Sequence, residues 1–326
     1  MAGYNTIRGL RVKYLSADPA TSEDGQVWYN STTGNLRVDG MVLAAAWASG
    51  ASVNTARRFT TGAGTQTASL LVNGYGPAFS NATEEYNGSS WSTQNVAPFS
   101  VYGSSSGGTQ TAVWVTGGDL GTAINQVTGE YDGTNWSTSG TNPNAKNSGG
   151  GCGPQTAGLY AGGQEASGTQ TYNGSSWTST GNSLNVARTD VSQSMTGTQT
   201  AAIIVGDASP SASAVAESYN GSAWTAITAI PTVGYGIGSS GIQTSALIYG
   251  GGPLAFGGTT TALWDGSSWA NAPALGTPRG GGGSGKGSSP SSAAFYAAGQ
   301  TSGPTNRSEM EVYTGVSTQI KNITTS

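Results

Sequence analysis

Apolar residues occur along the chain in short, strand-length runs that are separated by glycine and small polar residues. Five segments share one form, a turn followed by an apolar stretch and a pair of small residues. They read GTQTASLLVNG, GTQTAVWVTGG, GPQTAGLYAGG, GTQTAAIIVGD and GIQTSALIYGG, with Gln66, Gln110, Gln155, Gln199 and Gln243 at intervals of 44 or 45 residues. Runs of this length between turn signals predict β-strands. Their fixed interval predicts one repeated unit.

A second phrase follows each strand: an aromatic residue, a turn, and a tryptophan five positions later. The pairs are Tyr86/Trp91, Tyr131/Trp136, Tyr172/Trp177, Tyr219/Trp224 and Trp264/Trp269. The turn between them always holds Asn-Gly or Asp-Gly, the dipeptides that tolerate the positive φ of a tight hairpin. Each phrase therefore predicts a β-hairpin whose two strands each bury an aromatic residue.

A sixth copy of the unit is divided between the two ends of the chain. PSSAAFYAAG at 290–299 repeats the apolar strand, and Tyr313 repeats the aromatic position, but no tryptophan follows. The missing residue is Trp47, because WASGASVNTAR aligns with WTSTGNSLNVAR at 177–188. Units of about 45 residues with four strands are typical of propeller blades. The sequence predicts an all-β, six-bladed β-propeller over residues 47–316, four antiparallel strands per blade, closed by the Trp47 strand.

The repeated unit resembles the Kelch repeat. The features in common are an apolar strand ending in a Gly-Gly doublet, then a tyrosine, a tryptophan and an arginine about ten residues further on. The chain departs from the Kelch pattern in its tyrosine–tryptophan spacing of five and in Asp207, which replaces the second glycine of one doublet. The resemblance implies a Kelch-like propeller.

The segment before the repeats carries a different resemblance. Residues 25–38 combine Trp28-Tyr29, a Ser-Thr-Thr-Gly turn and Leu36-Arg37-Val38. This run is similar to short hairpins in tail-fibre and other virion proteins of marine tailed bacteriophages. The resemblance implies that residues 1–46 are a virion-attachment segment with a β-hairpin, whose partners are other virion proteins. Residues 317–326 are then a C-terminal tail.

Composition narrows the possible partners. Charged residues make up 9% of the chain and the net charge is −4, so phosphate-contact binding of nucleic acid is not expected. No apolar run is long enough to cross a membrane, and the N-terminus lacks the apolar core of a secretory signal. We expect assembly in the host bacterial cytoplasm and a final location on the virion surface. The single cysteine, Cys152, is expected to be a small packed residue.

Candidate chemistry is sparse. The chain has no histidine, which excludes a Ser-His-Asp triad and imidazole metal ligands, so no catalytic residue, metal or cofactor is predicted. Glu84, Glu217 and Glu311 stand two residues before the strand tyrosine in three units, and we interpret them as partners of backbone or turn groups. GGGGSGKG at 280–287 approximates a phosphate loop but has Gly287 where Ser or Thr is required, so we interpret it as a flexible linker.

Two sets of residues are candidates for ligand binding. Arg57, Lys146, Arg188 and Arg279 follow their tryptophans by ten or eleven residues, which predicts a column near the mouth of the central channel. This column either ties blades together or forms a partial cationic ring for carboxylated or sulfated glycans. Phe79 and Phe256 lie in the segments that vary most between repeats, where binding loops are expected, and are candidates for stacking on a sugar.

The sequence favours a non-enzymatic phage virion surface protein that adheres to host or environmental glycans. It leaves open whether the location is a tail fibre or spike, or a capsid decoration or head fibre. Two alternatives are a sialidase- or glycosidase-like propeller that cleaves glycans and a cytoplasmic Kelch scaffold for protein interactions. A homo-oligomer is possible, and a trimer is suggested only by analogy with fibres.

Overall fold

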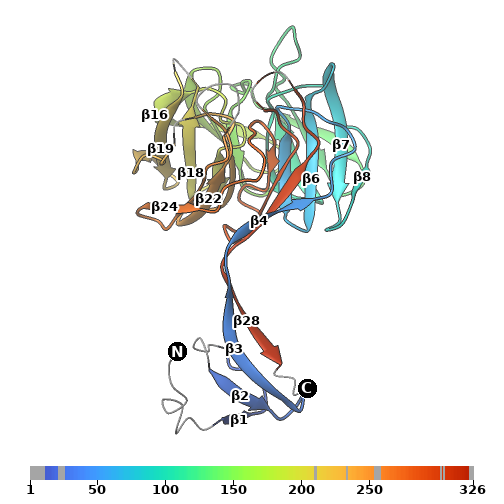
Figure 1. The fold of residues 1–326 in the computed structure, drawn as a ribbon. Coiled ribbons are helices and arrows are strands. Elements are labelled where there is room, and N and C mark those ends of the chain that lie inside the picture. Colours follow the sequence, from blue (N-terminus) through green and yellow to red (C-terminus); the bar gives the residue numbers. More distant parts are fainter. Residues whose placement is uncertain are drawn as a thin grey trace. The chain divides into compact units, whose positions relative to one another are not determined.

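The fold is all-β in the computed structural model, which describes residues 12–20, 26–208, 211–232, 234–252, 258–301, 303 and 305–322. The chain divides into two compact units (Figure 1). The first unit is Met1–Ala45 with Gly315–Ser326, and the second is Ala46–Thr314. The described strands form seven four-stranded sheets where the sequence predicted six units. The additional sheet belongs to the first unit, and the other six belong to the second.

Every sheet of the second unit is antiparallel, and we number these sheets 1 to 6 along the chain. Sheet 1 is β5 (Thr61–Thr65), β6 (Ala68–Tyr75), β7 (Phe79–Tyr86) and β8 (Trp91–Thr93); sheet 2 is β9 (Ser105–Thr109), β10 (Ala112–Thr116), β11 (Val127–Tyr131) and β12 (Trp136–Thr141); sheet 3 is β13 (Gly150–Cys152), β14 (Gly158–Ala161), β15 (Ala166–Tyr172) and β16 (Trp177–Arg188). Sheet 4 is β17 (Met195–Gly197), β18 (Ala202–Asp207), β19 (Ser213–Tyr219) and β20 (Trp224–Ala226); sheet 5 is β21 (Gly238–Ile242), β22 (Ser245–Tyr249), β23 (Thr261–Trp264) and β24 (Trp269–Ala272); sheet 6 is β25 (Gly283–Ser284), β26 (Ala293–Ala297), β27 (Met310–Thr314) and β4 (Ala46–Gly50). The first strands of successive sheets contact one another, and β25 of sheet 6 contacts β5 of sheet 1. This arrangement is that of a β-propeller.

Sheet 6 is assembled from both ends of the repeat region. β4 pairs with β27, and Trp47 lies opposite Tyr313, as each tryptophan does in the other sheets. The chain enters sheet 6 from the first unit at Ala46 and goes back into the first unit after Thr314. The first unit therefore takes the place of a hairpin turn between β27 and β4. Both covalent links between sheet 6 and the first unit therefore start from the end of the strands at which the Asn/Asp-Gly turns of the other sheets lie. We call this end the hairpin end. The pairing also covers the edge that β27 would otherwise expose.

The predicted hairpins are confirmed, and their turns explain the repeated Asn/Asp-Gly. In the first of them the Asn87 side-chain oxygen accepts hydrogen bonds from the backbone N–H groups of Ser89 and Ser90, at 3.0 and 2.9 Å. Gly88 has a φ of 92°, a conformation that other residues adopt only at a cost. The other four hairpins repeat both features. Local chemistry thus determines these turns.

The paired aromatic residues pack on each other within each sheet. Their ring centroids are 4.8 to 5.2 Å apart in all six sheets, Trp47 and Tyr313 included. The indole N–H then reaches the preceding sheet. In four sheets it donates to a threonine three residues before the strand aromatic; these bonds are Trp47 to Thr261, Trp136 to Thr83, Trp177 to Thr128 and Trp224 to Thr169, at 2.7 to 3.1 Å. The repeated tryptophan therefore joins neighbouring sheets.

The repeated glutamine has the same function at the hairpin end. Gln110 donates to the carbonyl oxygens of Ser69 and Tyr86 in the preceding sheet, at 3.1 and 2.7 Å. Gln155 and Gln199 make the equivalent pairs of bonds to their own preceding sheets. Buried carbonyl groups at the contact between sheets are satisfied in this way.

The first unit has its own four-stranded sheet of β1 (Lys13–Leu15), β2 (Val27–Asn30), β3 (Asn35–Leu43) and β28 (Ser317–Asn322). β2 and β3 form the hairpin that the sequence predicts within residues 25–38. The segment predicted as a C-terminal tail is instead in part a strand, because β28 pairs along β3. Asp18 holds this unit together: it accepts hydrogen bonds from Trp28 (3.0 Å) and Asn30 (2.8 Å) and pairs with Arg37.

Candidate binding site

Three members of the predicted cationic column are buried and paired with glutamates. Arg57, Arg188 and Arg279 have no exposed surface. Arg57 pairs with Glu84, Arg188 pairs with Glu217 at 2.7 Å, and Arg279 pairs with Glu311 at 3.0 Å. These arginines cannot form an accessible ring for glycans, which corrects the binding hypothesis for all three. Their function is structural, because a buried guanidinium requires a partner and hydrogen-bond acceptors.

We call the contact between two successive sheets a junction. The Arg188–Glu217 pair shows how the junction between sheets 3 and 4 is built. Arg188 lies at the end of β16 in sheet 3 and also donates to the carbonyl oxygen of Gly206, at 2.8 Å, in sheet 4. Glu217 on β19 in turn accepts from the backbone N–H of Asn185, at 2.7 Å. Burial lowers the pKa of Arg188, and the nearby carboxylate opposes that shift. The carboxylate is thus occupied by its own arginine and by backbone N–H groups.

Two of the remaining junctions are apolar. In sheet 2 the position of the glutamate is Gly129, and a side chain there would meet Pro98 and Phe99 within about 3.2 Å. In sheet 5 the position is Ala262, which lies in an apolar cluster with Ile230. Packing replaces the ion pair at both places, so neither junction needs a charged residue.

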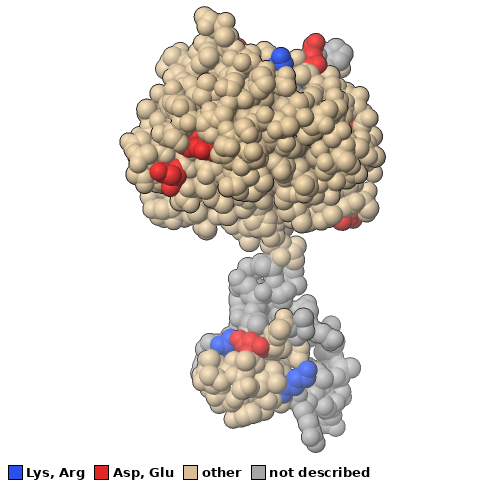
Figure 2. Space-filling view, turned by 180° about the vertical axis from the view of Figure 1, so that it is seen from behind, with Lys and Arg blue, Asp and Glu red and all other residues tan. Residues whose placement is uncertain are grey.

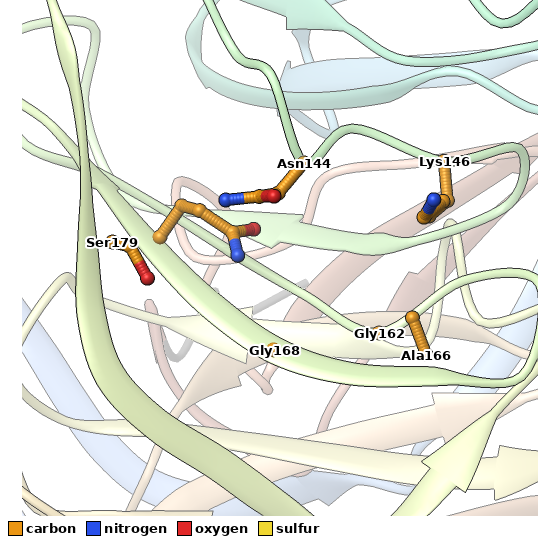
Figure 3. A pocket seen from close by; sticks show the side chains of 7 residues that line it. Asn144, Lys146, Gly162, Ala166, Gly168 and Ser179 are labelled. Carbon is orange, nitrogen blue, oxygen red and sulfur yellow. The ribbon is translucent and has the colours of Figure 1, made fainter.

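The sixth junction, in sheet 3, has neither an arginine–glutamate pair nor apolar packing at these positions. Lys146 stands at the arginine position and Gln170 at the glutamate position. A cavity of about 240 Å³ lies between them, lined also by Asn144, Ser179, Gly162, Ala166 and Gly168 (Figure 3). Gln170 is 3% exposed, and its Oε1 atom is buried with no hydrogen-bond partner. Of the four predicted cations, Lys146 is thus the one that lines an accessible cavity.

The backbone establishes that Lys146 is equivalent to the arginines. Its carbonyl oxygen accepts from the N–H of Gly118 at 3.1 Å, as the Arg188 carbonyl oxygen does from Gly163 at 2.9 Å. The hydroxyl of the buried Tyr160 holds the same turn, since it accepts from the Lys146 N–H at 2.7 Å and donates to its carbonyl at 3.1 Å. The cavity therefore occupies the space that an ion pair fills in sheets 1, 4 and 6.

Six equivalent residues, one ahead of each sheet, adopt positive φ angles of 51° to 66°: Phe59, Gly103, Ser148, Asp190, Gly236 and Gly281. Backbone hydrogen bonds run from each of these turns to the next: Gly103 to Phe59, Ser148 to Gly103, Val191 to Ser148, Gly236 to Asp190, Gly281 to Gly236 and Thr60 to Gly281, at 2.7 to 3.3 Å. The last bond returns to the first turn. A bulky residue in this conformation, such as Phe59, is strained, and such strain is often found at functional sites.

An aromatic cluster lies beside Phe59, at the end of the strands opposite to the hairpins. It consists of Phe59, Tyr75, Phe79 and Tyr102, all half-buried, with ring centroids 5.3 to 6.2 Å apart. The guanidinium of Arg58 lies 4.8 Å from the centre of the Tyr75 ring. Half-exposed aromatic rings next to charged groups suit contact with a sugar. Sequence reasoning found only Phe79, because the other three lie in connectors and at a strand end. Phe256 lies outside the described residues.

The predicted flexible linker at 280–287 is wrong. Residues Gly283–Ser284 form β25, and Lys286 is buried, with its ammonium 3.1 Å from the Ser106 carbonyl oxygen and 3.2 Å from Thr61 Oγ1. Gln193, ahead of sheet 4, donates to the same Thr61 hydroxyl of sheet 1 at 3.0 Å. Side chains of sheets on opposite sides therefore meet at the axis. Glycine is needed here for close backbone approach: a side chain at Gly283 would lie 2.2 Å from Leu71.

Burial lowers the pKa of Lys286 to about 7. Between that value and the ordinary 10.5, the unfolded chain binds a proton at this residue that the folded chain does not, so stability rises with pH across the interval. We expect the free energy of unfolding of the wild type, minus that of Lys286→Met, to increase from pH 7 to pH 10 in urea titrations. A difference that stays constant from pH 7 to pH 10 would contradict the assignment.

Cys152 is fully buried, as the sequence predicts for a small packed residue. Burial also raises the pKa of its thiol to about 12, which leaves it unreactive near neutral pH. Among the described residues, no helix is long and apolar enough to cross a membrane. The same residues contain no cluster of three or more Cys, Asp or Glu side chains that could hold a metal ion.

Comparison with known proteins supports the fold alone. The sequence matches no protein-family model and no curated protein. Among solved structures the chain is similar to YjhT, with a TM-score of 0.65 and 13% sequence identity. The similarity covers 82% of this chain and 98% of that one. At this identity the match establishes a β-propeller-type fold and does not extend to activity.

Proposed function

We propose that the chain is a non-enzymatic surface protein of a phage virion and that it adheres to host or environmental glycans. In this proposal the second unit is a six-bladed, Kelch-like propeller closed by β4. The sheet-to-sheet hydrogen bonds that return from Gly281 to Thr60 support closure. The similarity of residues 25–38 to virion-protein hairpins supports attachment through the first unit.

The direction in which the chain leaves the propeller is the observation that carries this proposal. Both links to the first unit start from the hairpin end of sheet 6. The connectors and the variable loops lie at the other end of the strands, where Arg58 pairs with Tyr75 and Tyr102 with Asp119. The aromatic cluster lies at the end of the strands from which neither link starts, and in this proposal that end contacts the glycan. Charged side chains are sparse on the surface of the second unit that Figure 2 shows, which suits a hydroxyl-rich ligand.

Tyr102→Ala is expected to weaken adhesion to host surface polysaccharide by roughly tenfold, because one stacking platform is worth about 1.4 kcal/mol. The measurement is binding of the purified full-length chain to polysaccharide on a glycan array. Tyr14→Ala, which removes an exposed tyrosine of the first unit, is the control and should bind as the wild type does. Equal loss in both variants would argue against the cluster.

Location on the particle needs its own test. Mass spectrometry of purified virions should detect the chain, and electron microscopy with an antibody against the second unit should label the tail or the capsid. A chain that is abundant in infected cells and absent from purified virions would overturn the proposal and favour a cytoplasmic scaffold.

A further inference from the structure

We propose that the cavity between Lys146 and Gln170 binds a uronic acid, a sugar ring that carries a carboxylate. The proposal rests on the proposed function, since it names one ligand of an adhesive propeller. It is argued from different residues than the aromatic cluster, however, and its test does not depend on the virion.

The cavity is an exception to a pattern that the molecule otherwise completes. Three junctions are filled by arginine–glutamate pairs and two by apolar packing. At the Lys146 junction no side chain of the described residues fills the equivalent space. The turn that carries the residue is kept, because the Lys146 carbonyl oxygen accepts from the Gly118 N–H as the Arg188 carbonyl oxygen does from the Gly163 N–H. The space is thus preformed by the fold rather than by local distortion.

Two polar groups at this junction require different partners. The Lys146 side chain is half-buried and makes no ion pair with any described residue, so it favours an anion. Gln170 Oε1 is an acceptor without a donor, and it favours a ligand with a hydroxyl group. A simple anion would leave Gln170 unsatisfied, and a neutral sugar would leave Lys146 uncompensated. A hydroxylated carboxylate satisfies both.

The remaining lining fits the same ligand. Asn144 and Lys146 extend from one loop between β12 and β13, and Ser179 comes from β16 (Figure 3). Ser179 is paired in register with Gln170 on the neighbouring strand, so both residues line the same part of the cavity. The volume of about 240 Å³ is below the roughly 300–1,000 Å³ of drug-sized ligand sites. One sugar ring is therefore the appropriate size.

Glucuronate and galacturonate are the probes, titrated into the full-length chain by isothermal calorimetry. At least one of them should bind with one site per chain, while glucose and acetate should bind at least roughly tenfold more weakly, which is about 1.4 kcal/mol. Lys146→Met should weaken binding of the uronate by at least the same factor. Equal binding of glucose and the uronates, or no binding of either uronate, would overturn the proposal.

The decisive variant rebuilds the missing ion pair. Lys146→Arg with Gln170→Glu should fill the cavity as Arg188 and Glu217 fill theirs, so uronate binding is lost while the melting temperature is kept or raised. This outcome separates loss of the site from loss of the fold. Retained binding in the double variant would place the ligand elsewhere and refute the site.

Two further measurements complete the test. The first distinguishes the source of the ligand, and the second separates this cavity from adhesion through the aromatic cluster. A uronate-containing oligosaccharide that binds more tightly than the free acid identifies a polysaccharide residue as the ligand, and equal binding identifies the free acid; both results support the site. Tyr102→Ala should leave uronate binding unchanged. A failure of uronate binding therefore rejects this cavity, whereas adhesion through the aromatic cluster is tested separately.

Discussion

Glu217→Ala is expected to lower the free energy of unfolding by about 3–5 kcal/mol, the loss typical when one partner of a buried ion pair is removed. Arg188 would keep its charge in a site with no exposed surface, with only backbone carbonyls as partners. Urea unfolding followed by tryptophan fluorescence would measure the change.

Sheet 3 supplies the matched control. Gln170 occupies the same position but already lacks a partner for Oε1, so Gln170→Ala should cost no more than about 1 kcal/mol. Replacing Arg188 and Glu217 together by leucine should recover much of the loss, since no buried charge is left unpaired. Similar losses for Glu217→Ala and Gln170→Ala would mean that the ion pair does not hold the junction.

Removal of β4 is expected to have the second large effect. A chain starting at residue 45 keeps β4, whereas a chain starting at residue 51 leaves β27 without its neighbour and Tyr313 without Trp47. Loss of a packed tryptophan alone costs about 3–5 kcal/mol, and the exposed edge of β27 adds a site for aggregation. We expect the shorter chain to melt at a much lower temperature or to aggregate on gel filtration.

The two truncations differ by six residues, so the comparison isolates closure from loss of the first unit. The longer chain should melt close to the second unit of the intact protein. If both truncations were equally stable, β4 would not be a structural part of the propeller.

The hairpins and their partners were predictable because their signals are local. Asn87 and Gly88 determine a turn within four residues, and the aromatic residues follow at fixed spacing. Trp47 was identified because a repeat count left one tryptophan missing. The threonines that accept the indole bonds, such as Thr128 and Thr169, also recur at one position, and this regularity was available in the sequence.

The arginine column shows where sequence reasoning reached its limit. Arg188 and Glu217 are 29 residues apart, and only the packing of two sheets decides that they are buried together. The same ambiguity affected residues 280–287, where glycine was interpreted as flexibility although it permits close packing around Lys286. The cavity at Lys146 could not be predicted, because only the packing of two sheets brings Lys146 and Gln170 to the same space.

The course of the chain through sheet 6 has a mechanical consequence. β3 is followed by β4, and β27 is followed by β28, so two paired ladders lie in series along the same two chain segments. A force applied between residues 12 and 322 would open the β3–β28 ladder one hydrogen bond at a time, like a zipper, before it reached Trp47 and Tyr313. Under such a force the sheet of the first unit would therefore unfold before the propeller does.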